Sequence, residues 1–249
     1  MPECLPNSRE SAHSAPFGTT HWSVVLLAGA GSEPQAAKAL EKLCHIYWRP
    51  LYAFSRRQGN SPEQAADLTQ EFFAHLLATD ALKQVSQERG KFRSFLLASF
   101  KNLASNEWLR SQRQKRGGGV SVLSLEDLAL EEQRQQNIGE ELTPEMIFDR
   151  SWAEAILAQA LARLRAECDS DLKARRFDDV KLFLLGEQGD DSMAAAAERL
   201  QMSLSAIKAL VHRLRQRFRE LVRHEIAQTV GTRAELDEEI RYFCAVFGS

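Results

Sequence analysis

Hydrophobic positions recur at steps of three and four residues along most of the chain, which is the period of an amphipathic α-helix. The first stripe runs from Ala36 to Gln58 and continues through Pro50, which can kink a helix without ending it. Its apolar members are Leu40, Leu43, Tyr47, Leu51 and Phe54. Because no run alternates between polar and apolar positions as a strand does, the pattern predicts an all-α protein.

Two more helices are expected in the N-terminal half. Ser61, Pro62 and Glu63 are typical of a helix start, with serine as the cap and proline in the first turn, and they predict a helix to about Ala78. A helix from Lys91 to Arg116 should end at the glycines 117–119. These helices predict a first small domain over residues 17–116, after a disordered leader at residues 1–16.

The middle of the chain has no sustained period. Residues 117–149 are acidic and rich in glutamine, which predicts a flexible linker with one short helix near Ser124 to Leu130. The helical pattern resumes at Arg150 and predicts a second small domain over residues 150–226. A C-terminal helical extension follows at residues 227–249, where Leu236, Ile240, Phe243 and Phe247 lie at helical steps.

The sharpest local signal in the second domain is a helix-turn-helix. A short helix from Ala194 to Leu200 is followed by a turn at Gln201 and Met202, and Ser203 caps a long basic helix. Glycine usually occupies the turn position held by Gln201, since it adopts a left-handed backbone freely. A glutamine there costs on the order of 1 kcal/mol, which a folded domain tolerates.

In this motif the first turns of the second helix enter the major groove of DNA. We expect four early positions to read bases, namely Ser205, Lys208, Ala209 and His212, and the cap Ser203 to belong to the same DNA-binding surface. Phosphate contacts are expected from Arg213, Arg215 and Arg217. The alternative is an ordinary helical hairpin with a basic outer face.

The charge distribution supports nucleic-acid binding although the formal net charge of −2 does not. Residues 89–116 carry eight Lys or Arg against one acid, and residues 203–224 carry six against one. Between them, residues 123–150 carry eight acids against two arginines. Two basic blocks separated by an acidic block predict two surfaces that face a polyanion, although a solvated helix face would look the same.

The first basic block also carries aromatic residues. Phe92, Phe95, Phe100 and Trp108 are interleaved with cations, a composition that can hold phosphates and stack unpaired bases. The alternative is that most of these rings are core residues, because several follow helical steps.

Two motifs resemble conserved regions of extracytoplasmic-function RNA polymerase sigma factors. Asp67-Leu-Thr-Gln-Glu-Phe-Phe73, followed by Phe92-Arg-x-Phe-Leu, Asn102-Leu-Ala-x-Asn and Arg110, resembles their second region. The basic helix pair, with Met202-Ser203, Ile207-Lys208 and His212-Arg213-x-Arg215, looks like their fourth region. Thr20-His-Trp-Ser23 and Glu225-Ile-Ala-Gln-Thr229 are similar to a longer-chain group with terminal extensions.

The resemblance implies a sigma factor that directs core RNA polymerase to promoters and assists their melting. It assigns polymerase binding to Asp67, Gln70, Glu71 and Phe72. It assigns the −10 promoter element to Lys91, Arg93, Lys101, Asn102, Asn106 and Arg110, with the loop before them capturing a flipped base. The helix capped by Ser203 would bind the −35 element. Phe95 replaces the family's usual Trp and Asn106 its usual Asp, which leaves the contacts there open.

Other classes of protein are less favoured. A stand-alone helix-turn-helix regulator would give the Asp67–Phe73 motif no role. An enzyme such as a nuclease is not expected, because the acidic pairs at 178–179 and 190–191 have no His or Lys partner at a useful spacing. The four cysteines lie far apart without CxxC spacing, so we expect a reduced cytoplasmic protein without a metal site. No apolar run reaches membrane-spanning length, so no membrane segment is expected, and no cofactor is expected either.

Two acidic segments, the linker and the C-terminal tail, are candidates for regulating the implied sigma activity. In the sigma family the linker threads toward the RNA exit path, where its negative charge would mimic RNA. The tail from Glu225 carries five acids against two arginines. It is expected either to pack on one domain as a helix or to act as a latch over a DNA-binding surface. An anti-sigma factor or other regulatory partner stays open.

Overall fold

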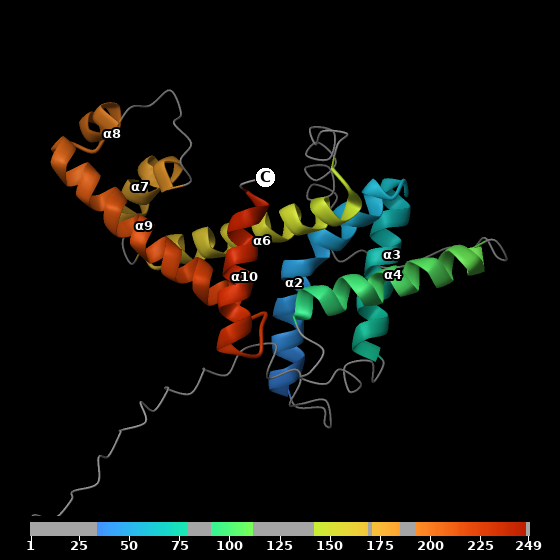
Figure 1. Cartoon of the computed structure of the whole chain (residues 1–249). Helices are drawn as coiled ribbons and strands as arrows, with labels where there is room; N and C mark the ends of the chain where they lie inside the picture. The colour runs from blue at the N-terminus through green and yellow to red at the C-terminus, as the bar shows by residue number, and fades with distance from the viewer. Residues whose placement is uncertain (1–33, 79–90, 112–141, 169–170, 185–192, 248–249) are drawn as a thin grey trace, which may run out of the picture.

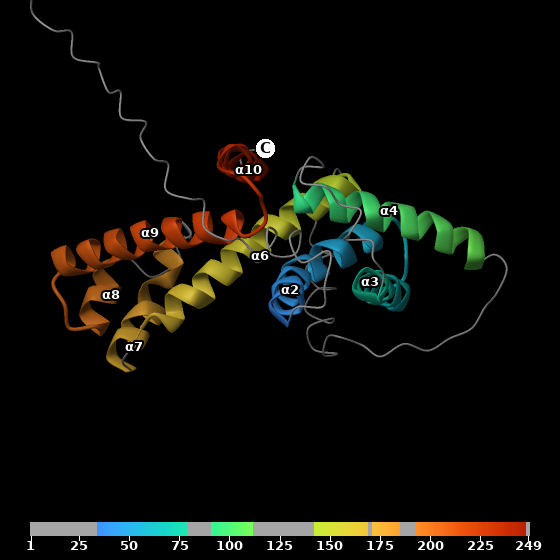
Figure 2. The same cartoon turned by 90° about the horizontal axis from the view of Figure 1, so that it is seen from below.

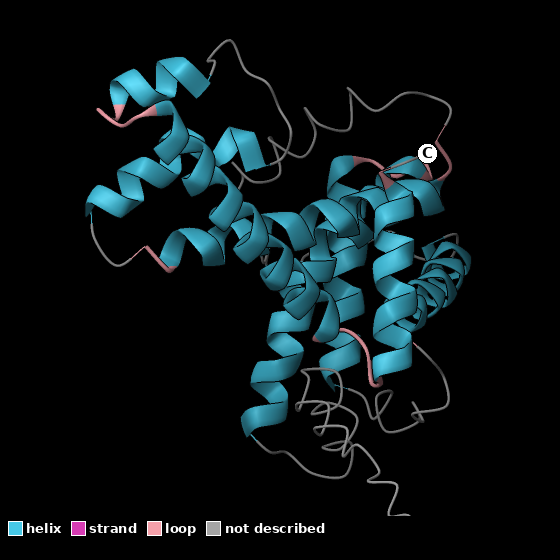
Figure 3. Ribbon diagram, turned by 60° about the vertical axis from the view of Figure 1, so that its left-hand side comes forward, coloured by secondary structure: helices cyan, strands magenta, loops and turns pink. Residues whose placement is uncertain are grey.

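The computed structural model describes residues 34–78, 91–111, 142–168, 171–184 and 193–247, and every regular element within these ranges is a helix (Figure 1). The all-α prediction is confirmed, and no strand is drawn in the described part of the chain in Figure 3. The helices are α2 (Pro34–Arg57), α3 (Pro62–Ala78), α4 (Phe92–Ser111), α6 (Pro144–Ala166), α7 (Asp171–Val180), the 3-10 helix η3 (Lys181–Leu184), α8 (Met193–Arg199), α9 (Leu204–Ala227) and α10 (Arg233–Val246). The predicted leader and residues 117–141 of the predicted linker lie outside the described residues, whereas residues 144–149 of that linker belong to α6.

The boundary between α2 and α3 follows the sequence signals. Pro50 lies inside α2, as the stripe predicted, and Gly59 takes a φ of +95° just after the helix ends. The Ser61 hydroxyl oxygen accepts from the Gln64 backbone N–H at 3.2 Å. In return the Gln64 side chain accepts from the Ser61 N–H at 2.9 Å, so the two residues cap α3 reciprocally.

Aromatic rings hold α2, α3 and α4 together. The Phe100 ring lies 6.0 Å from that of Phe54 and 5.4 Å from that of Phe72, both edge to face. Phe92 and Phe100 are fully buried and Phe95 is half-buried, so the core interpretation holds for the first two rings. The Trp108 side chain lies outside the described side chains.

Helix α6 packs along α2 and shares its core (Figure 2). It begins at Pro144, six residues before the predicted start, because Thr143 caps it by accepting from the Met146 N–H at 3.2 Å. Trp152 is fully buried, and its ring meets that of Phe243 edge to face at 5.8 Å. The hydrophobic core of the first three helices therefore extends into the second half of the chain.

Helix α9 links this shared core to two smaller clusters. Near its start, Ile207 and Val211 are buried with Ala196 and Ala197 of α8. Further along, Phe218 and Leu221 pack with residues of α6 and α7, and Ile226 joins the core around α2. One helix of 24 residues thus contacts every cluster of the described chain.

Helix α10 returns along the molecule after a short turn. Its start is a capping box, in which Glu235 N–H donates to the Thr232 hydroxyl at 3.2 Å and Thr232 N–H donates to the Glu235 carboxylate at 3.0 Å. Leu236 and Phe243 are buried against α6 and α9. The tail is therefore a packed amphipathic helix.

Replacing Phe100 with alanine should lower the free energy of unfolding by about 3–5 kcal/mol, because it removes a ring that is fully buried between α2 and α3. Urea unfolding followed by circular dichroism measures this loss. Phe247→Ala is the control, because this ring is 49% exposed and its loss should cost less than about 1 kcal/mol. Equal losses for the two variants would contradict the assigned core.

Candidate nucleic-acid interface

Helices α8 and α9 lie where the sequence predicts a helix-turn-helix, and they are joined by a tight turn at Gln201 and Met202. Ala197 of α8 and Ile207 of α9 are buried against each other's helix, and Leu200 and Leu210 are partly buried beside them. This is the set of four apolar positions that the sequence spacing predicted. The two helices lie at the end of the molecule opposite α3 and α4 (Figures 1 and 2).

The turn has the backbone that the motif requires. Gln201 has a φ of +51°, and it is the single non-glycine residue with positive φ in the described chain. The reversal lets the Met202 N–H donate to the Ala197 carbonyl at 2.9 Å. Ser203 then caps α9 by accepting from the Ala206 N–H at 3.2 Å. The left-handed turn and the cap were both predicted from the sequence.

The first turns of α9 present polar side chains to solvent. The residues expected to read bases are all exposed, namely Ser205, Lys208, Ala209 and His212, and so is the cap Ser203. Arg213 is exposed as well, and no polar contact to it occurs within the described part of the chain. The surface available to a duplex is therefore the N-terminal half of α9.

The two arginines further along α9 have partners inside the protein. Arg215 donates from Nε and Nη2 to the Phe183 carbonyl, at 3.0 and 2.6 Å, and so anchors η3 to α9. Arg217 makes a bidentate pair with Glu167 at 2.8 Å, which lowers the pKa of that carboxyl and raises the pKa of the guanidinium. A phosphate role for either residue would require it to exchange these contacts.

Helix α3 carries the residues expected to bind polymerase. Asp67 and Glu71 are exposed and Gln70 is half-buried, so one polar face is open along this helix. Phe72 is 2% exposed and packs on Phe100, because its position falls on the apolar stripe of α3. The prediction that Phe72 contacts polymerase is therefore replaced by a role in the hydrophobic core.

The residues expected to contact the −10 element lie along α4. Asn102 is exposed, and Lys101 is half-buried with its ammonium 2.6 Å from the Glu145 carboxylate of α6. This bond is the main cause of the lowered pKa of Glu145. The side chains of Asn106 and Arg110 lie outside the described side chains, so their roles stay predictions.

The first turn of α4 is covered by acidic groups. Arg93 is 9% exposed, and its Nε donates to Glu239 at 2.9 Å while Nη1 donates to Asp149. The Lys91 ammonium lies 3.0 Å from Glu239 and 3.5 Å from Glu238. The Arg93 side chain is therefore enclosed in this conformation, and the contact with DNA that the sequence predicted would require these groups to release it.

Aromatic rings complete the enclosure of Arg93. Its guanidinium carbon lies 4.2 Å from the centre of the Tyr242 ring and 5.1 Å from that of Trp152. Burial opposes the charge, but Glu239 and Asp149 outweigh it and raise the pKa of Arg93 above its ordinary value. The guanidinium stays charged in this enclosure.

Sequence reasoning missed the partners of Arg93. Glu239 lies three residues after Leu236 and four before Phe243, on the apolar stripe of the tail. An acid on such a stripe is a signal that a buried cation faces it, because an unpaired buried carboxylate is costly. The second carboxylate, Asp149, stood at the edge of the predicted linker and carried no comparable signal.

Comparison with known families identifies the first three helices. Residues 44–114, which include most of α2 and all of α3 and α4, match the family model described as Sigma-70 region 2. The chain contains a sigma-70 region 2 domain. At the family level this domain binds core RNA polymerase and promoter DNA. No curated protein and no solved structure matches the chain.

The region 2 domain supports a sigma factor role in transcription initiation. Its match ends before α6 and therefore does not extend to the helix-turn-helix. The role of α8 and α9 consequently rests on their geometry.

Two other properties bear on the site. None of the described helices is both long enough and apolar enough to span a membrane. Cys44, Cys168 and Cys244 form no disulfide within the described part of the chain, and no cluster of three or more His, Cys, Asp or Glu there is placed to hold a metal ion.

Gln201→Gly should raise the free energy of unfolding by about 0.5–1 kcal/mol. Glycine relieves the strain of the left-handed backbone in the folded protein, and this gain exceeds the stability lost because glycine makes the unfolded chain more flexible. Urea unfolding measures the change. Gln159→Gly on the exposed face of α6 is the matched control and should destabilise by about 0.5–1 kcal/mol. Destabilisation by both substitutions would argue against strain at the turn.

Proposed function

We propose that this protein is a sigma factor of the extracytoplasmic-function type, which brings core RNA polymerase to promoters and assists their melting. The observation that carries the proposal is the region 2 domain at residues 44–114, followed in the same chain by a helix-turn-helix with an open polar face on α9. A sigma factor needs both parts, because it binds polymerase and reads two promoter elements. The proposed place of action is the cytoplasm, where the polymerase works.

Polymerase binding is proposed for the open face of α3. Asp67, Gln70 and Glu71 fall within two turns of this helix, and none of the three side chains is buried. Their family counterparts dock on the clamp helices of the largest polymerase subunit. The face is polar and partly anionic, which suits a partner surface with exposed cations and amide groups.

The −10 element is proposed to bind along α4. Lys91, Arg93, Lys101 and Asn102 follow one another along its first half and would hold the backbone of the separated strand. Asn106 and Arg110 would extend this surface toward the end of the helix. Unstacking one base costs a few kcal/mol, which stacking and pocket contacts in the protein would offset.

The −35 element is proposed to bind as duplex in front of α9. Lys208 and His212 are four residues apart, so they share one face of the helix and can reach adjacent base edges. Ser203 and Ser205 lie at the helix start, where free backbone N–H groups favour a phosphate. Arg213 would hold the backbone beside them.

A stand-alone regulator that binds operators without polymerase is the alternative. Its support is the helix-turn-helix alone, which would serve either protein equally well. It leaves the region 2 match and the open polar face of α3 without a role. No reaction is proposed for the chain, because sigma-70 factors are not enzymes.

Reversing the charges on α3 with Asp67→Lys and Glu71→Lys together should abolish retention of core RNA polymerase on the immobilised protein. The reason is that two cations would replace two anions in the proposed docking face. Pull-down with purified core enzyme measures this. Glu198→Lys on exposed α8 is the control and should retain wild-type binding. Wild-type protein that fails to retain core enzyme would favour the stand-alone regulator.

Lys208→Ala should reduce transcription from promoters selected in vitro by roughly 5- to 150-fold, the range for one lost base contact of about 1–3 kcal/mol. Selection from a randomised promoter library with core enzyme supplies these templates. Gln216→Ala, an exposed change two turns further along α9, should leave transcription within about two-fold of wild type. Equal activity of Lys208→Ala and wild type would remove this residue from the −35 surface.

A further inference from the structure

Every described cation of the proposed −10 surface is paired with a carboxylate from the second half of the chain. The pairs involve Lys91, the residue just before α4, and Arg93 and Lys101 on α4. Four carboxylates from α6 and α10 contact them, and we refer to these as the acidic clamp: Glu145, Asp149, Glu238 and Glu239. Helix α4 therefore meets carboxylates where the proposed function places DNA phosphates.

The clamp is strongest at Arg93. Glu239 is fully buried and contacts both Arg93 and Lys91, while Asp149 holds the other side of the guanidinium. Such shielded pairs resist screening by salt. The pair between Lys101 and Glu145 is 40% and 47% exposed, and a surface pair of this kind contributes little by itself. The first turn of α4 is thus held most firmly.

The clamp also covers the backbone at the start of α4. The Phe92 N–H donates to the Thr229 carbonyl at 3.4 Å, which brings the turn before α10 against this helix end. Tyr242 lies over Arg93, and its hydroxyl donates to Asp149. A DNA strand and α10 cannot both occupy the first turn of α4.

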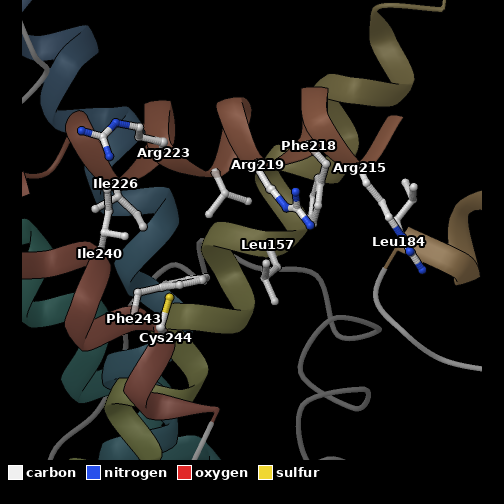
Figure 4. Close-up of a pocket in the computed structure, with 11 residues that line it drawn as sticks. Leu157, Leu184, Arg215, Phe218, Arg219, Arg223, Ile226, Ile240, Phe243 and Cys244 are labelled. Atoms are coloured by element: carbon white, nitrogen blue, oxygen red, sulfur yellow. The ribbon is translucent and has the colours of Figure 1, made fainter. Parts of the chain in front are cut away.

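Helix α10 is incompletely packed on its other side. A groove of about 630 Å³ separates it from α9, lined by apolar side chains such as Phe218, Val222 and Ile240, with Arg219 on its wall (Figure 4). Phe247 is 49% exposed at the end of the helix. Space beside a helix means fewer dispersion contacts, so detaching α10 costs less than removing a fully packed helix.

We propose that the acidic clamp inhibits the protein by occupying the cations of α4, and that promoter DNA must displace it. This inference rests on the proposed function, because it takes α4 as a DNA-binding surface. The clamp is part of the same chain, so it competes at the high effective concentration of a tethered ligand. Binding of promoter DNA to α4 and release of α10 would then favour each other, since the DNA requires the open form.

The test is binding of the full-length protein to the single-stranded non-template −10 oligonucleotide from the selected promoter, measured by fluorescence anisotropy, together with transcription by the reconstituted holoenzyme. Glu145→Gln with Glu238→Gln removes two exposed clamp charges without disturbing the core. A second variant ends at Gly231 and lacks α10. Each should bind the oligonucleotide at least about five-fold more tightly than wild type, the lower end of ordinary coupling between two sites.

The matched control is Asp237→Asn with Glu220→Gln. It removes the same two charges, and these carboxylates pair with Arg223 and Arg217 of α9, away from α4. The control should bind within about two-fold of wild type, because these two carboxylates pair with Arg223 and Arg217 and so release no cation of the proposed −10 surface. An equal gain in the control would overturn the clamp and attribute the effect to net charge.

The outcomes separate the two proposals. If wild type transcribes and the clamp variants neither bind nor transcribe better, the clamp is wrong and the sigma function stands. If neither wild type nor variants transcribe with core enzyme, both fail. If the wild-type protein does not support transcription but the clamp variants do, both the sigma function and the clamp are supported. Circular dichroism checks folding, and if the truncated chain is unfolded, the double glutamine variant decides.

Discussion

The buried charge of Arg93 imposes the strongest constraint on this structure. A guanidinium enclosed to this degree must be paired, since an isolated buried charge would cost many kcal/mol. Its partners come from two other helices, Asp149 from α6 and Glu239 from α10. Three segments that are distant in sequence therefore meet around one side chain. The rings of Trp152 and Tyr242 seal the meeting point from solvent.

The apolar core and this charged cluster stabilise the contact between the N-terminal and C-terminal halves of the chain in different ways. Rings from α2, α3 and α4 meet α6 along a continuous surface, which is non-directional and tolerant of small displacements. The charged cluster is directional, because the Arg93 guanidinium donates from Nε to Glu239 and from Nη1 to Asp149. Hydrophobic burial can thus hold α6 against α2, while the ion pairs determine where α10 and the first turn of α4 lie.

The local features were predictable from the sequence and the distant contacts were not. The cap at Ser203, the left-handed turn at Gln201 and the stripe of α2 follow from neighbouring residues, whose preferences act over a few positions. Arg93 reads as a surface cation, because nothing near it in sequence reveals a carboxylate 146 residues away. The polymerase contact predicted for Phe72 was wrong for a related reason. A family motif does not distinguish a residue that packs in the core from a residue that contacts a partner.

The length of α9 sets a distance that promoter binding must change. Its 24 residues span about 36 Å, and the turn after it touches the first residue of α4. The starts of the two proposed DNA-binding surfaces, Ser203 and Lys91, are therefore separated by about one turn of B-DNA, whereas elements two turns apart lie about 70 Å from each other. In this conformation the two surfaces are therefore too close together to match the spacing of such a promoter. Reading both elements at once would require the C-terminal end of α9 to leave the core, so the spacing between the elements would itself select the extended form.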